Sequence, residues 1–89
     1  MLRITKTFED DQTVILRLDG KVVDTTLSDL ESLCLQYRNK ENKTVMLDFA
    51  GVTFISHGGL RMLERIRDER IKMANGSVFV EALISGLKD

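Results

Sequence analysis

Apolar and polar residues alternate near the start of the chain, which predicts two strands. The apolar positions of segments 2–8 and 13–18 are Leu2, Ile4, Phe8, Val14, Leu16 and Leu18. Residues two apart on a strand face the same side of a sheet. The acidic segment 9–12 between the two runs is typical of a turn. We therefore expect an antiparallel hairpin whose second strand ends at Asp19-Gly20.

A first helix is predicted by apolar residues that recur at spacings of three and four. They are Leu27, Leu30, Cys34 and Tyr37. The preceding segment Asp24-Thr25-Thr26 contains residue types that begin helices, and Thr26 is expected as the N-cap, with Asp29 three residues later. The polar run 38–43 should end this helix and turn the chain.

A second helix is predicted from about Gly58 to Met73, with the pair Asn75-Gly76 as its C-terminal stop. The positions expected toward the sheet are Leu60, Leu63, Ile66 or Arg67, and Arg70 or Ile71.

Two further strands flank this second helix in the predicted order. Segment 44–49 is apolar on both faces, which is typical of a central strand covered on both sides. Segment 77–80 is expected as the last strand, and the segment 82–89 is long enough for about two turns of helix. The order strand-strand-helix-strand-helix-strand predicts one α/β domain over residues 1–89, with a mixed sheet of four to five strands and helices packed on it.

Composition narrows the classes of function. With 43% hydrophobic residues, 30% charged residues and a net charge of −1, the 89-residue chain is typical of one small globular domain. Since no block of like charge stands out, neither nucleic acid nor direct membrane insertion is expected. No apolar run is long enough to span a bilayer and no signal-peptide pattern occurs, so a cytoplasmic protein is expected.

The ionisable residues do not suggest catalysis. The chain has one His and one Cys, and neither a paired-acid pattern nor metal-ligand spacing. We expect no enzyme activity, catalytic residue, metal or cofactor. Cys34, among apolar neighbours, is expected as a small buried residue.

The candidate chemistry lies in the turn Ser56-His57-Gly58-Gly59, which opens the second helix. A helix N-terminus presents unpaired N–H groups and the positive end of the helix dipole. A small polar turn there can bind an anion, carry a phosphorylated hydroxyl or dock a partner. Ser56 is first a candidate N-cap, and the two glycines are expected to serve close backbone packing.

Five parts of the chain together carry a family resemblance. They are Leu16-Arg17-Leu18-Asp19-Gly20-Lys21-Val22, Thr26 with Leu30, Val45-Met46-Leu47-Asp48-Phe49, Gly51-Val52-Thr53-Phe54-Ile55 with Gly59-Leu60, and Ser85-Gly86-Leu87. In this order they resemble the STAS domain, the fold of bacterial anti-sigma factor antagonists. The resemblance implies a binding module in which a serine at the start of the second helix is phosphorylated by a kinase-like anti-sigma factor. The unphosphorylated antagonist binds that factor and frees the sigma factor.

The turn departs from this pattern. Aligned on Phe54 and Gly59, Ser56 stands at the position of an acid, His57 at the phospho-serine and Gly58 at the next serine. Asp24 comes one residue after the position of a second acid. The expected hydroxyl and both nearby acids are absent from their places, so we expect a module that phosphorylation of the usual serine does not control. Two alternatives stay open. One is phosphorylation of Ser56, one position before the usual serine, and the other is a phospho-accepting or pH-sensitive role for His57.

The resemblance implies a docking surface around the start of the second helix. Its expected residues are Asp24, Thr25, Thr53, Ser56, His57, Gly58 and Arg61. The expected partner is a kinase-like anti-sigma factor or another regulatory protein. Two alternatives are a small STAS accessory subunit of a phospholipid ABC-type transport complex and a nucleotide-binding STAS domain.

The segment after the last predicted strand is shorter than the C-terminal helix that the family usually carries. Only Leu83-Ile84-Ser85-Gly86-Leu87 stands at that place. A sheet flank left partly bare exposes apolar area, and such patches often become interfaces. A homodimer is therefore a further expectation.

Overall fold

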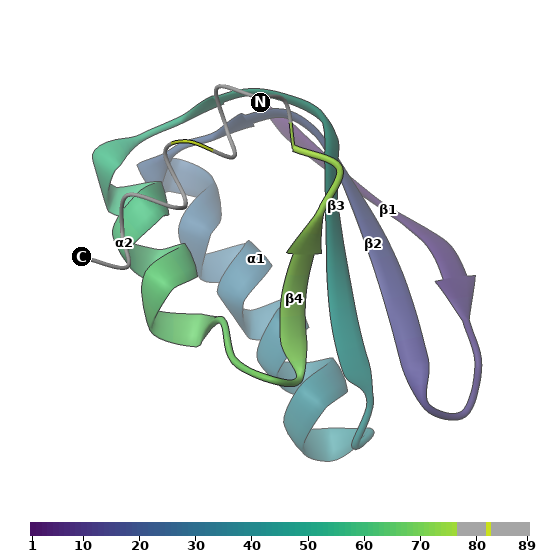
Figure 1. Ribbon diagram of the computed structural model, residues 1–89. Coiled ribbons are helices and arrows are strands. Elements are labelled where there is room, and N and C mark those ends of the chain that lie inside the picture. The colour runs from purple at the N-terminus through teal and green to yellow at the C-terminus, as the bar shows by residue number, and fades with distance from the viewer. Residues whose placement is uncertain (77–81, 83–89) are drawn as a thin grey trace.

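A mixed sheet with helices on one face forms the fold (Figure 1). The computed structural model describes residues 1–76 and 82. In chain order the elements are β1 (Leu2–Glu9), β2 (Thr13–Val22), α1 (Asp24–Leu35), the π-helical turn η1 (Gln36–Lys40), β3 (Thr44–Ile55), α2 (His57–Ile66) and β4 (Ile71–Ala74). The predicted α/β class is confirmed.

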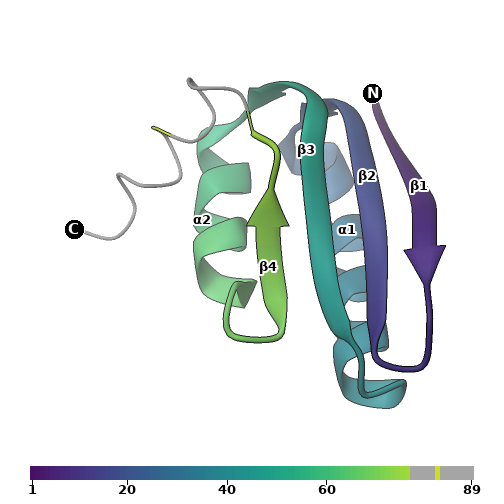
Figure 2. The same ribbon diagram turned by 45° about the vertical axis from the view of Figure 1, so that its right-hand side comes forward.

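The four strands of the sheet follow one another in chain order, β1-β2-β3-β4 (Figure 2). β1 and β2 pair antiparallel, which confirms the predicted hairpin. Its turn is held by Asp10, whose Oδ1 accepts the backbone N–H groups of Gln12 and Thr13 at 2.8 and 2.7 Å. β2–β3 and β3–β4 pair parallel, each across a helical connection.

The core lies between the sheet and the two helices. Alternate residues of β2 and β3, among them Leu16, Leu18 and Leu47, are fully buried against apolar side chains of α1 and α2. Cys34 is also fully buried in this cluster, as predicted. Burial of one such side chain contributes roughly 1.5–3 kcal/mol, so this one layer supplies most of the drive to fold.

The two central strands are longer than the sequence predicts. Asp19-Gly20 does not end β2, which continues to Val22, and β3 continues past the predicted segment 44–49 through Gly51 to Ile55. The strands tolerate these residues because the β2–β3 register is irregular at two places, between Arg17 and Asp19 and between Gly20 and Lys21. Gly20 takes a φ of 105°, a conformation that favours glycine.

The predicted start of α1 is wrong by three residues. The helix begins at Asp24 after an extended Val23, so Thr26 is its third residue and not its N-cap. The Thr26 hydroxyl donates to the Val23 carbonyl at 2.8 Å, and it accepts the Val23 N–H at 3.3 Å. The threonine therefore closes the first turn from inside the helix. At the other end, the predicted polar run does turn the chain, through η1.

The second helix is shorter than predicted. α2 ends at Ile66, and the extended Arg67 leads into a turn in which Asp68 Oδ1 accepts the backbone N–H groups of Arg70 and Ile71 at 2.7 and 2.9 Å. Ile71 then enters β4 beside Val45. The expected helix from Gly58 to Met73 is therefore wrong beyond Ile66, and so is Asn75-Gly76 as its stop. Asn75 does have a φ of 60°, but it follows a strand.

β3 is not covered on both faces within the described residues. Both helices lie on the same side of the sheet in Figures 1 and 2. On the opposite side, Met46 and Asp48 are half-buried, whereas Val45 and Leu47 on the helix side are fully buried. The predicted strand at 77–80 lies outside the described residues, as does the C-terminal segment apart from Ala82.

Candidate functional site

Ser56 is the residue on which the candidate site is built. It joins β3 to α2 with an extended backbone, and its Oγ accepts the Gly59 N–H at 3.0 Å. Its own N–H donates to the Val22 carbonyl at 2.8 Å, which ties the turn to the end of β2. The N-cap interpretation of Ser56 is confirmed. The serine thus fixes both the start of α2 and its attachment to the sheet.

The hydroxyl of Ser56 also reaches across to the first helix. It donates to Asp24 Oδ1 at 3.0 Å, and Asp24 is the first residue of α1. An acidic group does therefore lie beside the turn, although sequence alignment places it one residue late. One carboxylate joins the starts of both helices, where the positive ends of their dipoles favour a negative charge by about 0.3–1 kcal/mol each.

The two glycines of the turn lie against neighbouring atoms. A Cβ added at Gly58 would lie 2.5 Å from Asp24 Oδ1, and one at Gly59 would lie 3.1 Å from the Val22 carbonyl oxygen. Side chains at either position require the surroundings to shift. The expectation that these glycines serve close packing is confirmed, and Asp24 occupies the space beside position 58.

His57 and Arg61 form the exposed part of the site. Arg61 Nε donates to His57 Nε2 at 3.1 Å across one turn of α2. The imidazole therefore interacts with the arginine rather than with the hydroxyl of Ser56. The neighbouring Ser56 and His57 do not form a nucleophile–base pair in this geometry, because the Ser56 hydroxyl donates to Asp24.

Two threonines complete the predicted set. Thr53 is exposed near the end of β3, and its hydroxyl donates to the Gly20 carbonyl at 3.2 Å. Thr25 is exposed next to Asp24 at the start of α1. The structure therefore brings Asp24, Ser56 and Gly58 into contact and joins His57 to Arg61. Thr25 follows Asp24 in α1, and Thr53 lies in β3, three residues before Ser56.

Phe54 belongs to this surface but is absent from the predicted set. Its side chain is 47% exposed, although it comes two residues after the buried Val52. Strict alternation along β3 would put both on the buried face. The irregular β2–β3 register turns Phe54 outward beside Lys21. The glycines at positions 20 and 51, one in each strand, were the available sequence signal for such an irregularity.

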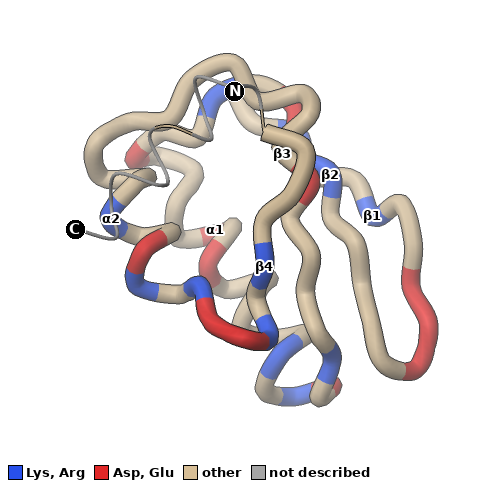
Figure 3. The backbone as a smooth tube through the Cα atoms, viewed as in Figure 1, with Lys and Arg blue, Asp and Glu red and all other residues tan. Residues whose placement is uncertain are grey.

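The electrostatics of the turn disfavour a phosphate ligand. The Asp24 carboxylate already lies against the N-terminal turn of α2, where a nucleotide phosphate would have to bind. Elsewhere the charges are mixed, with an acidic tip on the β1–β2 hairpin and basic residues along η1 (Figure 3). This distribution does not form a basic track within residues 1–76.

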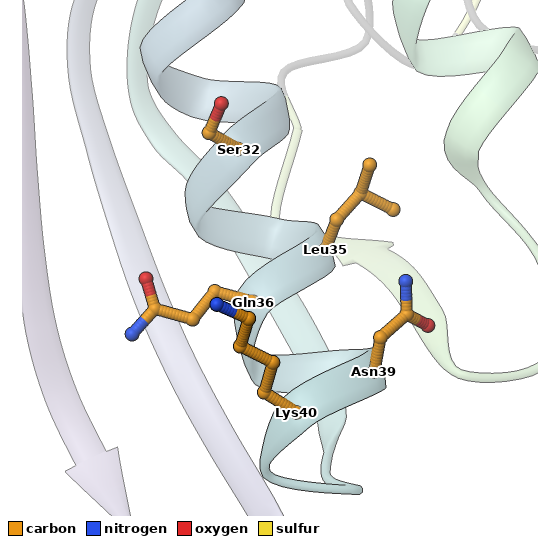
Figure 4. Close-up of a pocket in the computed structure, with 5 residues that line it drawn as sticks. All are labelled: Ser32, Leu35, Gln36, Asn39 and Lys40. Atoms are coloured by element: carbon orange, nitrogen blue, oxygen red, sulfur yellow. The ribbon is translucent and has the colours of Figure 1, made fainter.

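Other features of the described residues offer weaker sites. A shallow hollow on α1 and η1 is lined by Ser32, Leu35, Gln36, Asn39 and Lys40, and its side chains diverge (Figure 4). Over residues 1–76 and 82, no group of three or more His, Cys, Asp or Glu is placed to hold a metal ion. In the same part of the chain, no helix has both the length and the apolar character that crossing a membrane requires.

The perturbed pKa values lie away from the turn and have structural causes. Burial raises the pKa of the Cys34 thiol to about 12, so the group is protonated and unreactive at neutral pH. Hydrogen bonds from Lys43 and Lys6 lower the pKa of Glu9 at the hairpin tip. Backbone N–H groups of Arg70 and Ile71 lower the pKa of Asp68. The shifts of Glu9 and Asp68 mark hydrogen-bonded contacts, and the shift of Cys34 marks burial in the core.

Comparison with known proteins agrees with the fold. The sequence profile of the STAS domain matches residues 5–83. The solved structure of the anti-sigma factor antagonist SpoIIAA in its unphosphorylated form is similar, with a TM-score of 0.68 and 16% identity over 93% of this chain and 82% of that one. An antisigma-factor antagonist STAS domain from Rhodobacter sphaeroides has a TM-score of 0.61 and 15% identity over 83% and 86%. Curated protein sequences yield no match.

Proposed function

Because this chain belongs to the STAS domain family, we propose that it is a regulatory protein-interaction module that acts as an anti-sigma factor antagonist in a partner-switching pathway. Its partner in this proposal is a kinase-like anti-sigma factor in the cytoplasm of a bacterium. The docking surface consists of Asp24, Thr25, Thr53, Ser56, His57, Gly58 and Arg61, and is called the α2 turn surface below. The role is binding that changes transcription, not catalysis.

One observation carries the proposal that docking is not switched by phosphorylation of the usual serine. The Ser56 hydroxyl uses both its hydrogen-bonding functions, as donor to Asp24 and as acceptor from the Gly59 N–H. Positions 57 and 58 carry no hydroxyl. The α2 turn surface therefore offers no hydroxyl to a kinase at the position of the usual serine.

Phosphorylation of Ser56 itself would oppose these contacts. A phosphate removes the proton that Ser56 donates and places about −1.5 to −2 charges beside the Asp24 carboxylate. Like charges at such separations repel by roughly 1 kcal/mol or more, depending on solvent screening. These costs support a chain whose binding-competent form is the unmodified one.

The test is a native pull-down of the tagged chain from its own cells. Wild type is compared with Arg61→Glu on the α2 turn surface and with Lys72→Glu, which inverts an exposed charge on β4. The proposal predicts an ATPase of the histidine-kinase-like class with wild type and Lys72→Glu, and its loss with Arg61→Glu. Both variants are first checked for a native thermal transition.

Other outcomes would redirect the assignment. Recovery of a membrane-transport ATPase would replace this proposal with the accessory-subunit alternative. Saturable binding of a fluorescent GTP analogue to the purified chain would instead favour a nucleotide-binding domain. Equal recovery with Arg61→Glu and wild type would contradict docking through the α2 turn surface.

A further inference from the structure

A β-bulge near the end of β3 changes the direction of one aromatic side chain. In the β2–β3 pairing, Val52 lies opposite Gly20 and Phe54 opposite the very next residue, Lys21. Thr53 is therefore the extra residue of the bulge. Its hydroxyl donates to the Gly20 carbonyl at 3.2 Å, which holds the irregular backbone in place.

The bulge leaves Phe54 on the surface while its neighbours stay in the core. Val52 and Ile55 are 7% and 5% exposed, whereas Phe54 is 47% exposed. Without the extra residue, Phe54 would share the buried face with Val52. Bulges often re-aim a side chain next to a functional site, and a half-exposed phenylalanine has no role in the core of this fold.

One basic group without an acidic partner among the described residues lies beside the exposed ring, and a second lies on the helix that follows it. Lys21 pairs in the sheet with Phe54, and Arg61 lies one turn into the helix that begins three residues later. Neither forms an ion pair with any residue that the structure describes, and both are exposed. By contrast, Arg65, one turn further along α2, is paired with Glu31 at 2.8 Å. Lys21 beside Phe54 and Arg61 on α2 are thus available to carboxylates of another molecule.

We propose that Phe54 is the apolar anchor of the α2 turn surface, and that it inserts into an apolar pocket of a partner protein whose rim carries Asp or Glu side chains facing Lys21 and Arg61. This inference rests on the proposed function for the existence of a protein partner, but not for the identity of that partner. Aromatic residues are enriched among the few positions that carry most of the energy of an interface, and complementary charge around them adds specificity.

Phe8 provides a matched control within the same chain. It is also 47% exposed, also lies on a strand and also follows a register irregularity, in β1. Its surroundings differ, because it lies at the hairpin end of the sheet beside Glu9, Asp10 and Asp11. If exposed aromatic area alone caused partner binding, the two positions would contribute equally. If Phe54 is an anchor, it contributes and Phe8 does not.

The experiment is photo-cross-linking in the source cells with the full chain. p-Benzoylphenylalanine replaces Phe54 in one strain and Phe8 in another, and the cross-linked peptides are sequenced by mass spectrometry. The position 54 probe is repeated with Lys21→Glu, and with Lys40→Glu as a control for charge inversion at an exposed lysine of η1. Thermal melts of the purified variants verify that each is folded.

The expected result is one cross-linked protein from position 54, attached at a peptide with apolar residues beside Asp or Glu. The yield should be about tenfold lower from position 8 and with Lys21→Glu, and unchanged with Lys40→Glu. Equal yields at 54 and 8, no product from 54, attachment to a segment without acids, or attachment to a second copy of this chain would each overturn the inference. A cross-linked protein that is not a kinase-like ATPase would refute the proposed function alone.

Discussion

The double hydrogen bond of Ser56 leads to a quantitative prediction for Ser56→Ala. The change removes the acceptor of the Gly59 N–H and the donor to Asp24, both at 3.0 Å. Loss of an N-cap side chain costs about 1 kcal/mol, within a range of roughly 0.5–2. The hydrogen bond to Asp24 contributes less to stability than a buried hydrogen bond to a charged group, because Asp24 is exposed and water replaces the hydroxyl in the variant.

The expected decrease in the free energy of unfolding is therefore about 1–2 kcal/mol. In a domain of this size, each kcal/mol lowers Tm by about 4–8 °C. Urea titration followed by far-UV circular dichroism measures the change directly. Ser32→Ala is the matched control, since Ser32 is exposed on α1 and alanine is at least as favourable in a helix.

A double-mutant cycle separates the two bonds. If Ser56 bridges the helices, Ser56→Ala and Asp24→Ala together should cost less than the sum of the single changes, with a coupling of about 0.5–1 kcal/mol. Strict additivity would contradict the bridge between the helices. A loss for Ser56→Ala no larger than that for Ser32→Ala would refute the N-cap as well.

Three further predictions concern packing and titration. Gly59→Ala should lower the free energy of unfolding by about 1–3 kcal/mol, because the new Cβ would press on the Val22 carbonyl. An unchanged urea midpoint would argue against that contact. Cys34 should react with a thiol-specific disulfide reagent at pH 8 only as fast as the protein opens, since the pKa of its thiol is raised to about 12. Fast labelling of the native protein would show instead that the thiol is accessible. The pKa of Asp68 is lowered in the folded state. The stability that its carboxylate contributes is therefore present above the pKa of the unfolded chain, and it is lost as the pH falls through the pKa of the folded protein. Asp68→Asn should therefore destabilise at pH 7, with a difference from wild type that shrinks below about pH 4; a difference constant with pH would contradict this.

The sequence predicts the hairpin and the buried stripe of α1 because those patterns are local. Val14, Leu16 and Leu18 alternate as a strand requires, and Leu30 and Cys34 are buried in α1 at helical spacing. The end of α2 was harder to predict. Ile71 fits a helical stripe as well as a strand, β4 is only four residues long, and the sequence contains no proline to separate the two elements.

The candidate site likewise has some features that the local sequence predicts and others that depend on the tertiary structure. The N-cap role of Ser56 follows from residue type and position, and the packing role of the glycines follows from the turn. The contact between Ser56 and Asp24 spans 32 positions and depends on how the helices meet on the sheet, which no local pattern encodes. The exposure of Phe54 depends on one extra residue in β3. That bulge reverses the face that alternation assigns to the ring.

The central claim is that the unmodified α2 turn surface binds its protein partner without a serine switch. Intact-mass analysis of the chain, separated into its partner-bound and free pools from growing and from starved source cells, tests it directly. The account predicts the same unmodified mass in both pools under both conditions. A form heavier by about 80 Da, confined to the free pool, would show that phosphorylation releases the partner and would contradict the claim.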